Sequence, residues 1–130
     1  MNIRPLRRIT CLVTTMLLGC APEWGSLEFE LLNSPPSPHV LVDRYGEHIR
    51  LPEAIAVVVS AHPISDNGVD YDDHERVELV SENPAVFRVY RRPNRNEFVF
   101  VGVTAGTTCV EVRIDGSAEE CIPVEVTPPT

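Results

Sequence analysis

Apolar and polar residues alternate along most of this chain, over short stretches that turn residues separate. A period of two places every second side chain on one face of a β-strand, and beyond residue 38 no stretch has the helical period of 3.6. Residues 55–59 and 97–101 are apolar almost throughout, which predicts strands buried on both faces. The segments predicted as strands are 40–42, 46–51, 55–59, 76–80, 86–90, 97–101, 108–114 and 121–126.

Seven or eight short strands within residues 39–127 are typical of an all-β, Ig-like β-sandwich of antiparallel strands. A barrel with a similar number of strands is the alternative. In either fold, one face of each strand points into the core. The residues predicted to be buried are Val57, Val59, Val86, Val89, Phe98, Phe100, Val110, Val112, Ile122 and Val124.

Residues 20–38 precede this domain and have two interpretations. The Pro-rich end of the segment favours a stiff tether. The alternation of residues 27–32, with Leu27 and Phe29 on one face and Glu28 and Glu30 on the other, favours an edge strand. Trp24 either rests at lipid headgroups or packs on the domain.

Length and charge limit the classes of function. A chain of 130 residues forms one domain. The formal net charge is −8 with no Lys, and residues 88–95 hold the one Arg cluster beyond the N-terminal segment. Such an acidic chain is not expected to bind nucleic acid.

The N-terminus has the pattern of a signal peptide at residues 1–19. Three Arg and no acid lie in the first eight residues, and residues 9–18 form an uncharged, mostly apolar run. A membrane-spanning helix needs about 20 apolar residues, so this run predicts a secretory signal and not a transmembrane segment.

The end of that segment together with the next residue, Leu17-Leu18-Gly19-Cys20, resembles the lipobox of bacterial lipoproteins. The resemblance implies cleavage before Cys20, a diacylglycerol on its sulfur and an acyl chain, such as palmitate, on its amino group. It therefore implies a membrane as partner and the cell envelope as location, and Ala21 in place of Asp indicates the outer membrane where a cell has one. A plain signal peptide with an incidental Cys is the alternative.

Three further motifs occur in the order Gly46-Glu-x-Ile-x-Leu51, Ser81-Glu-Asn-Pro-Ala-Val-Phe-Arg-Val89 and Ala105-Gly-Thr-Thr-Cys-Val110. In this order they resemble the group 2 bacterial Ig-like domains that are repeated in cell-surface proteins such as intimins and invasins. Two departures stand out: the usual Trp before the second motif is absent, and Asn94 to Glu97 replaces the usual Gly at the next strand. The resemblance implies a fold and says little about function.

Cys109 and Cys121 are predicted to form a disulfide. Export leads to an oxidising compartment, and Cys20 is used for lipid, so two thiols remain in two strands that flank one turn. A three-residue loop over residues 114–116 places the two cysteines directly opposite each other. Both then lie on the outer face of the hairpin, away from Val110 and Val112.

Motifs of catalysis are absent: the sequence has no Gly-x-Ser-x-Gly, His-Glu-x-x-His or phosphate-binding Gly-rich loop, and four scattered His. No catalytic residue, metal ligand or cofactor is therefore assigned. One acidic segment, residues 66–75, is a weak candidate for Ca²⁺, a cation that takes six to eight oxygen ligands. Its candidate ligands are Asp66, Asp70, Asp72, Asp73 and Glu75.

Three classes of function follow. The first is a non-enzymatic, lipid-anchored Ig-like module that binds a protein or glycan, or assembles, at the cell envelope. The second is a structural accessory lipoprotein of an envelope complex. The third, an enzyme, lacks a recognisable catalytic group in the sequence.

Overall fold

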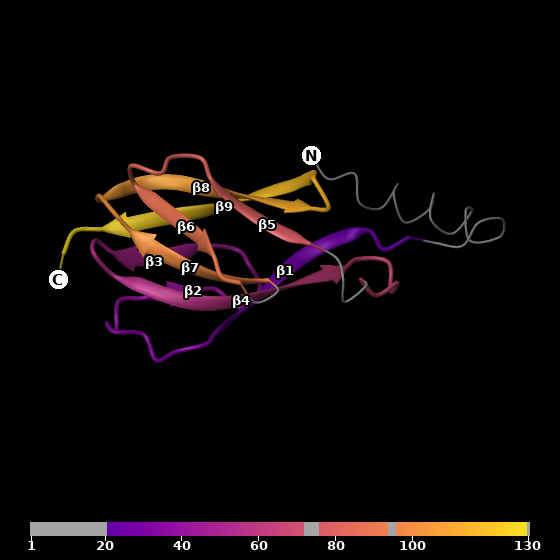
Figure 1. Ribbon diagram of the computed structural model, residues 1–130, viewed down its shortest axis with the longest axis horizontal. Coiled ribbons are helices and arrows are strands. Elements are labelled where there is room, and N and C mark those ends of the chain that lie inside the picture. The colour runs from indigo at the N-terminus through magenta and orange to yellow at the C-terminus, as the bar shows by residue number, and fades with distance from the viewer. Residues whose placement is uncertain (1–20, 72–75, 94–95, 130) are drawn as a thin grey trace.

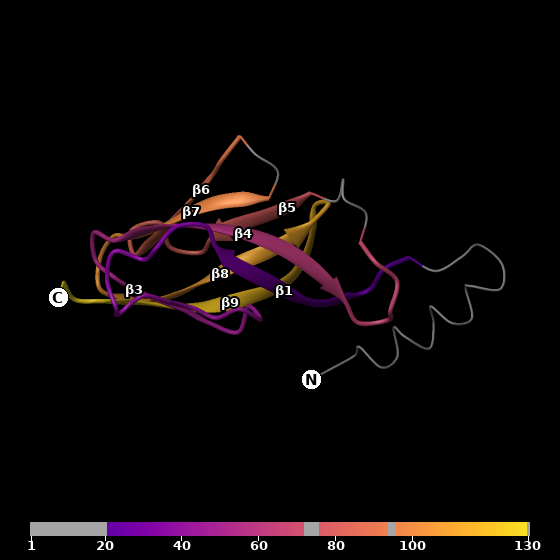
Figure 2. The ribbon, with the colours of Figure 1, turned by 90° about the horizontal axis from the view of Figure 1, so that it is seen from below.

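The computed structural model describes residues 21–71, 76–93 and 96–129, and within them the chain folds as a two-layer β-sandwich (Figures 1 and 2). The strands are β1 (Trp24–Leu31), β2 (Leu41–Val42), β3 (Ile49–Pro52), β4 (Ala56–Ser65), β5 (Val77–Ser81), β6 (Phe87–Arg91), β7 (Glu97–Gly102), β8 (Gly106–Ile114) and β9 (Ser117–Thr127). The predicted all-β sandwich is confirmed.

Four strands form one layer, sheet A, in the order β1-β4-β7-β6, and five form sheet B, in the order β2-β3-β9-β8-β5. All neighbours are antiparallel except β3 and β9, which run parallel from Ile49↔Val124 to Pro52↔Thr127. The prediction of antiparallel strands alone is therefore wrong at this pair. Because β3 and β9 are far apart in the sequence, no hairpin forces them to run in opposite directions.

The core lies between the sheets, where apolar side chains from both layers meet. Phe100 is fully buried at its centre and contacts Phe29 edge-on, with ring centroids 5.6 Å apart, and Phe87 at 5.4 Å. Eight of the ten predicted core residues are buried. The other two are half-buried: Val86 precedes the inward-facing Phe87, and Val89 shares the inward face of Phe87 but lies on β6, the edge strand of its sheet.

Both predicted two-faced strands bury one face only. In β4, Val57 and Val59 are buried while Val58 between them is half-buried, and in β7 Phe98 is buried while Val99 is half-buried. A two-layer sandwich leaves the outer face of each sheet uncovered, so a continuous apolar run does not require two buried faces.

Residues 24–31 belong to the sandwich as edge strand β1, so of the two interpretations of this segment the structure shows the strand. Leu27 and Phe29 enter the core, as the alternation predicts. Trp24 is also buried, and its indole nitrogen donates to the carboxylate of Glu120 at 2.7 Å. The indole thus closes the end of the core at which β1 begins.

Candidate functional site: the outer faces of the two sheets

The outer face of each sheet is the main surface of the domain, and the two differ in chemistry. Outer face A consists of the outward residues of β1, β4, β7 and β6, and outer face B of those of β2, β3, β9, β8 and β5. On outer face B, Arg50 pairs with Glu125 at 3.0 Å and Arg113 with Glu111 at 2.7 Å. This face is charged, and it carries the disulfide.

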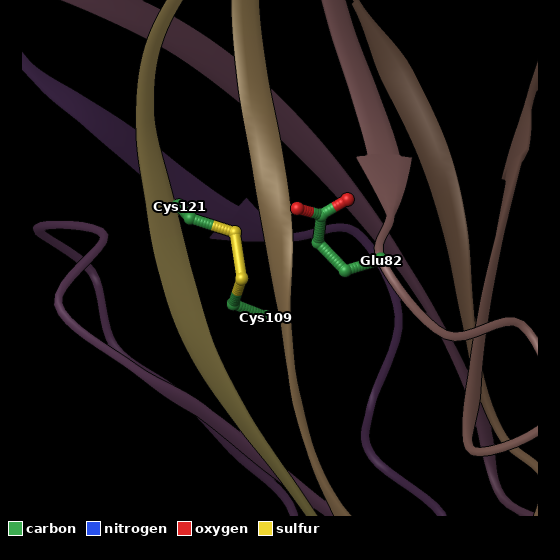
Figure 3. A group of neighbouring side chains, drawn as sticks. All are labelled: Glu82, Cys109 and Cys121. Atoms are coloured by element: carbon green, nitrogen blue, oxygen red, sulfur yellow. A yellow bond between two sulfur atoms is a disulfide. The ribbon is translucent and has the colours of Figure 1, made fainter.

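The disulfide joins Cys109 of β8 to Cys121 of β9, with Cα atoms 5.5 Å apart (Figure 3). It lies on the outer face of the hairpin, as predicted: Val110 and Ile122 beside it point into the core, while Cys121 is exposed. Export to an oxidising compartment stays a prediction, and the pairing of the two residues is a property of the fold.

The predicted register of this hairpin is wrong. Cys109 pairs with Pro123 and Glu111 with Cys121, so the two cysteines are diagonal neighbours. The loop has two residues, because Ile114 pairs with Ser117, and an irregularity between Val112 and Arg113 shifts the pairing. Asp115 and Gly116 have φ of 50° and 86°, the pair of positive angles that a type I′ turn requires and that Asp-Gly favours.

The carboxylate of Glu82 lies beside the disulfide. One of its oxygens and the two Sγ atoms all lie within 4.8 Å of one another, and Glu82 follows β5 next to β8 (Figure 3). Two thiolates and a carboxylate are ligands that Zn²⁺ accepts, but a disulfide offers no thiolate. In the oxidised protein this group instead places a carboxylate beside both sulfur atoms of the disulfide.

The Ca²⁺ candidates fall partly outside the described residues, namely Asp72, Asp73 and Glu75. In the described part, Asp66 and Asp70 do not join any group of three close ligand side chains. Backbone bonds give this loop another role: the N–H of Asp66 donates to the carbonyl of Glu23 at 2.8 Å, and the Asn67 side chain donates to the carbonyl of Ala21 at 2.9 Å. The loop therefore holds the start of the folded chain.

Arg side chains of the predicted basic cluster fasten the open edge between β5 and β6. Arg91 donates to the carbonyl of Val77 at 2.6 Å and lies 5.2 Å from the centroid of the Phe98 ring. Burial, reinforced by Arg76, lowers the pKa of Arg91 from its ordinary value, and Glu78 opposes this shift. Arg95 lies outside the described residues. Within the described part, Arg91 of this cluster contacts the domain itself, at Val77 and Phe98.

Outer face A carries an apolar row that sequence reasoning did not find. Val58 of β4 pairs with Val99 of β7, and Val99 pairs with Tyr90 of β6. At the opposite edge the N–H of Leu32 donates to the carbonyl of Val58 at 2.8 Å. The exposed fraction is 41% for Leu32 and 51% for Tyr90. The outward residues Val58 and Val99 belong to the continuous apolar runs 55–59 and 97–101, which from the sequence predict burial on both faces.

The surface depressions are open and shallow. One, of about 570 Å³, is lined by residues that include His39, Leu41, Arg50 and Glu125, and its charged pair Arg50–Glu125 is engaged at 3.0 Å. A second, of about 290 Å³, lies between the edges of β5 and β6, beside Tyr90 and Arg88. The lining of the first also includes Thr127, and the Glu125 carboxylate there is held by Arg50.

Comparisons with known proteins connect the chain to one kind of fold. A scan against protein-family models finds no match, and neither does a search of curated proteins. The fold is similar to that of surface layer protein SbsC: domains 1–6 give a TM-score of 0.54 at 12% identity over 85% of this chain and 14% of that one. Domains 5–6 give 0.51 at 15% identity, over 72% of this chain and 45% of that one.

This chain spans less than half of the length of each of these solved chains. At such identities the likeness concerns the fold alone. In the part of the chain that the structure describes, no helix is long and apolar enough to cross a membrane.

Proposed function

We propose that this chain is a lipid-anchored, non-enzymatic module of the bacterial cell envelope that has a structural or assembly role. The observation that carries the proposal is the fold itself: a two-layer sandwich similar in architecture to domains of a surface layer protein. Broad sheet faces and strand edges suit contacts between proteins better than chemistry on a small substrate.

The position of the predicted lipid supports the anchoring part of this proposal. Trp24 opens β1 only four residues after Cys20. Ala21 and Glu23, which lie between them, are joined to the loop at Asn67 by hydrogen bonds of 2.9 and 3.3 Å. A lipid on Cys20 would therefore hold this end of the sandwich close to the membrane, while β9 ends at the opposite end (Figure 1).

The motifs that resemble group 2 bacterial Ig-like domains occupy positions where the backbone demands particular residues. Gly46 has φ of 72°, and a Cβ there would collide with the carbonyl of Leu27. Asn96, near the position where the family usually has Gly, has φ of 53°, a conformation that Asn tolerates better than most residues. These backbone requirements support the proposal that the chain belongs to that family.

Lipidation is tested by Cys20→Ser in the full chain, expressed in a bacterium that processes lipoproteins. The wild-type protein is expected in the membrane fraction with an acylated N-terminal Cys20, by mass spectrometry. The variant is expected to stay unprocessed or to lose its acyl mass, because only a thiol forms the thioether. Cys11→Ser, within the same apolar run, is the matched control and should leave acylation unchanged. A mature N-terminus elsewhere, without acyl mass, would contradict the proposal.

A further inference from the structure

We propose that outer face A is an interface between two copies of this chain, related by a two-fold axis that runs parallel to the strands between β4 and β7. The first observation is the apolar row across all four strands: Leu32, Val58, Val99 and Tyr90. In a single copy, both ends of this row are exposed to water. Ala56, two residues before Val58, pairs with Val101, two residues after Val99, and this pair on the same face widens the row.

The second observation is the charge of the neighbouring row on the same face. It runs from Glu30 on β1 through Ser60 on β4 and Glu97 on β7 to Arg92 beside β6. Arg92 pairs with Glu97 at 3.3 Å. Opposite charges therefore stand at the two edges of the sheet, with Glu30 at one edge and Arg92 at the other.

A two-fold axis parallel to the strands exchanges β1 with β6 and β4 with β7. It stacks Tyr90 on Leu32 of the second copy, and Val58 on Val99 of the second copy. In the next row it brings Arg92 opposite Glu30 of the second copy. Sheets that stack face to face cross at about 30°, so rows close to the axis stay in register.

An axis along the apolar row would be unfavourable by comparison. It places each strand opposite the same strand of the second copy, and it brings the row that contains Arg92 opposite the row that contains Arg88. Arg92 would then approach Arg88 of the second copy, and two like charges would be brought together at the β6 edge. Charge therefore selects the axis that runs along the strands.

A second copy fits this face better than a lipid surface does. The chain has a formal charge of −8, so two copies repel each other except where a face carries both signs. On outer face A, Glu28 pairs with Arg44 at 3.3 Å, while Glu30 is an exposed acid at the β1 edge and Arg92 lies at the other edge. Self-complementary charge at the two edges is a property that a two-fold interface needs and a membrane does not.

The size of the face predicts a weak dimer. Four strands about 4.8 Å apart and about seven residues long cover roughly 400 Å² per copy. Two copies together would bury about 800 Å², which is less than the ~1,000 Å² of a stable interface and is typical of weak, transient contacts. We expect dissociation constants in the micromolar range or weaker. Anchoring of both copies in one membrane would raise their effective concentration, but the interface itself does not depend on the lipid.

The test uses the unlipidated chain from residue 21 onward, which contains every described strand. Sedimentation equilibrium from about 10 μM to 1 mM should show a monomer–dimer equilibrium. Val99→Glu, at the centre of the face, should weaken it at least tenfold. The matched control is Val80→Glu, a 39% exposed residue on outer face B, which should leave it unchanged. Far-UV circular dichroism and thermal melting establish that each variant is folded.

A charge exchange tests the axis. Glu30→Arg and Arg92→Glu should each weaken the dimer several-fold, and the double variant should recover most of the loss, because the new charges again face each other across the axis. Recovery would not follow if either residue acted only within its own chain.

Three results would overturn the proposal: a monomer at every concentration, equal effects of Val99→Glu and Val80→Glu, or no recovery in the double variant. Vesicles of phosphatidylethanolamine and phosphatidylglycerol provide a separate measurement. Binding of a monomer to them that Val99→Glu abolishes would make this a lipid-binding face and would also overturn it. None of these results depends on whether Cys20 is acylated.

Discussion

The two sheets of this small domain are held and exposed in different ways. Sheet A supplies the aromatic side chains of the core, Phe29, Phe87, Phe98 and Phe100, and has an apolar row on its outer face. Sheet B supplies aliphatic side chains to the core, and its outer face carries ion pairs and a disulfide. Both outer faces carry ion pairs, since Arg92 pairs with Glu97 on outer face A. The apolar row on one face and the disulfide on the other are what distinguish them, because the outward residues decide that chemistry.

The largest expected effect tests the aromatic side of the core. Phe100→Ala removes a fully buried ring that contacts two other rings, and the cavity cannot close completely between two sheets. We expect a loss of about 3–5 kcal/mol in the free energy of unfolding, measured by urea denaturation. Val112→Ala, in the aliphatic layer of sheet B, should cost less. An equal cost would show that the rings are not the main source of stability.

The second effect concerns the covalent link, which the described part of sheet A lacks. Cys109→Ala with Cys121→Ala should lower the free energy of unfolding by about 2–3 kcal/mol, since the bond closes a short loop of the unfolded chain. The cysteines are 12 residues apart in the sequence. Because the bridge lies on the outer face, the folded variant should keep the far-UV spectrum of the wild type. Loss of the β spectrum would indicate that the bridge fixes the sandwich and does not merely clamp one hairpin.

The third effect concerns the edge at which the two sheets meet. Arg91→Met removes the 2.6 Å hydrogen bond to the Val77 carbonyl and the charge over the Phe98 ring, while it keeps part of the apolar stem. We expect a loss of about 1–2 kcal/mol in urea denaturation, at the low end for hydrogen bonds that involve a charged group because Arg91 is exposed to solvent. Arg88→Met is the control, because the Arg88 side chain donates to the exposed Pro84 carbonyl. Equal losses in the two variants would argue against a special role for Arg91.

The smallest effect on stability is expected on outer face A itself. Tyr90→Ser changes a residue that is 51% exposed, so the free energy of unfolding of the monomer should move by no more than about 0.5 kcal/mol. The same change should weaken self-association, because Tyr90 lies at the end of the apolar row. Denaturation at low protein concentration, together with sedimentation at high concentration, separates the two effects. A large loss of monomer stability would make Tyr90 part of the core.

The sequence determined the strand-rich fold and most of the core, because a period of two directly sets which side chains face inward. It also determined the disulfide pair and its outer position. Cys109 and Cys121 lie one residue away from the buried Val110 and Ile122, so alternation places them on the opposite, outer face. The turn at Asp115-Gly116 was recognisable from its dipeptide. The length of the loop was not, because one residue more or less in the loop satisfies the same pattern of alternation.

Only the tertiary structure decided the features that depend on residues distant in the sequence. The parallel pairing of β3 with β9, the closure of the core by Trp24 on Glu120, and the contact of Glu82 with the disulfide each join segments that no local pattern relates. The row from Leu32 to Tyr90 depends on the order of strands in sheet A. Local periodicity decides which side chains of a strand share a face. The strand order decides which strands are neighbours, and so which side chains form a continuous surface.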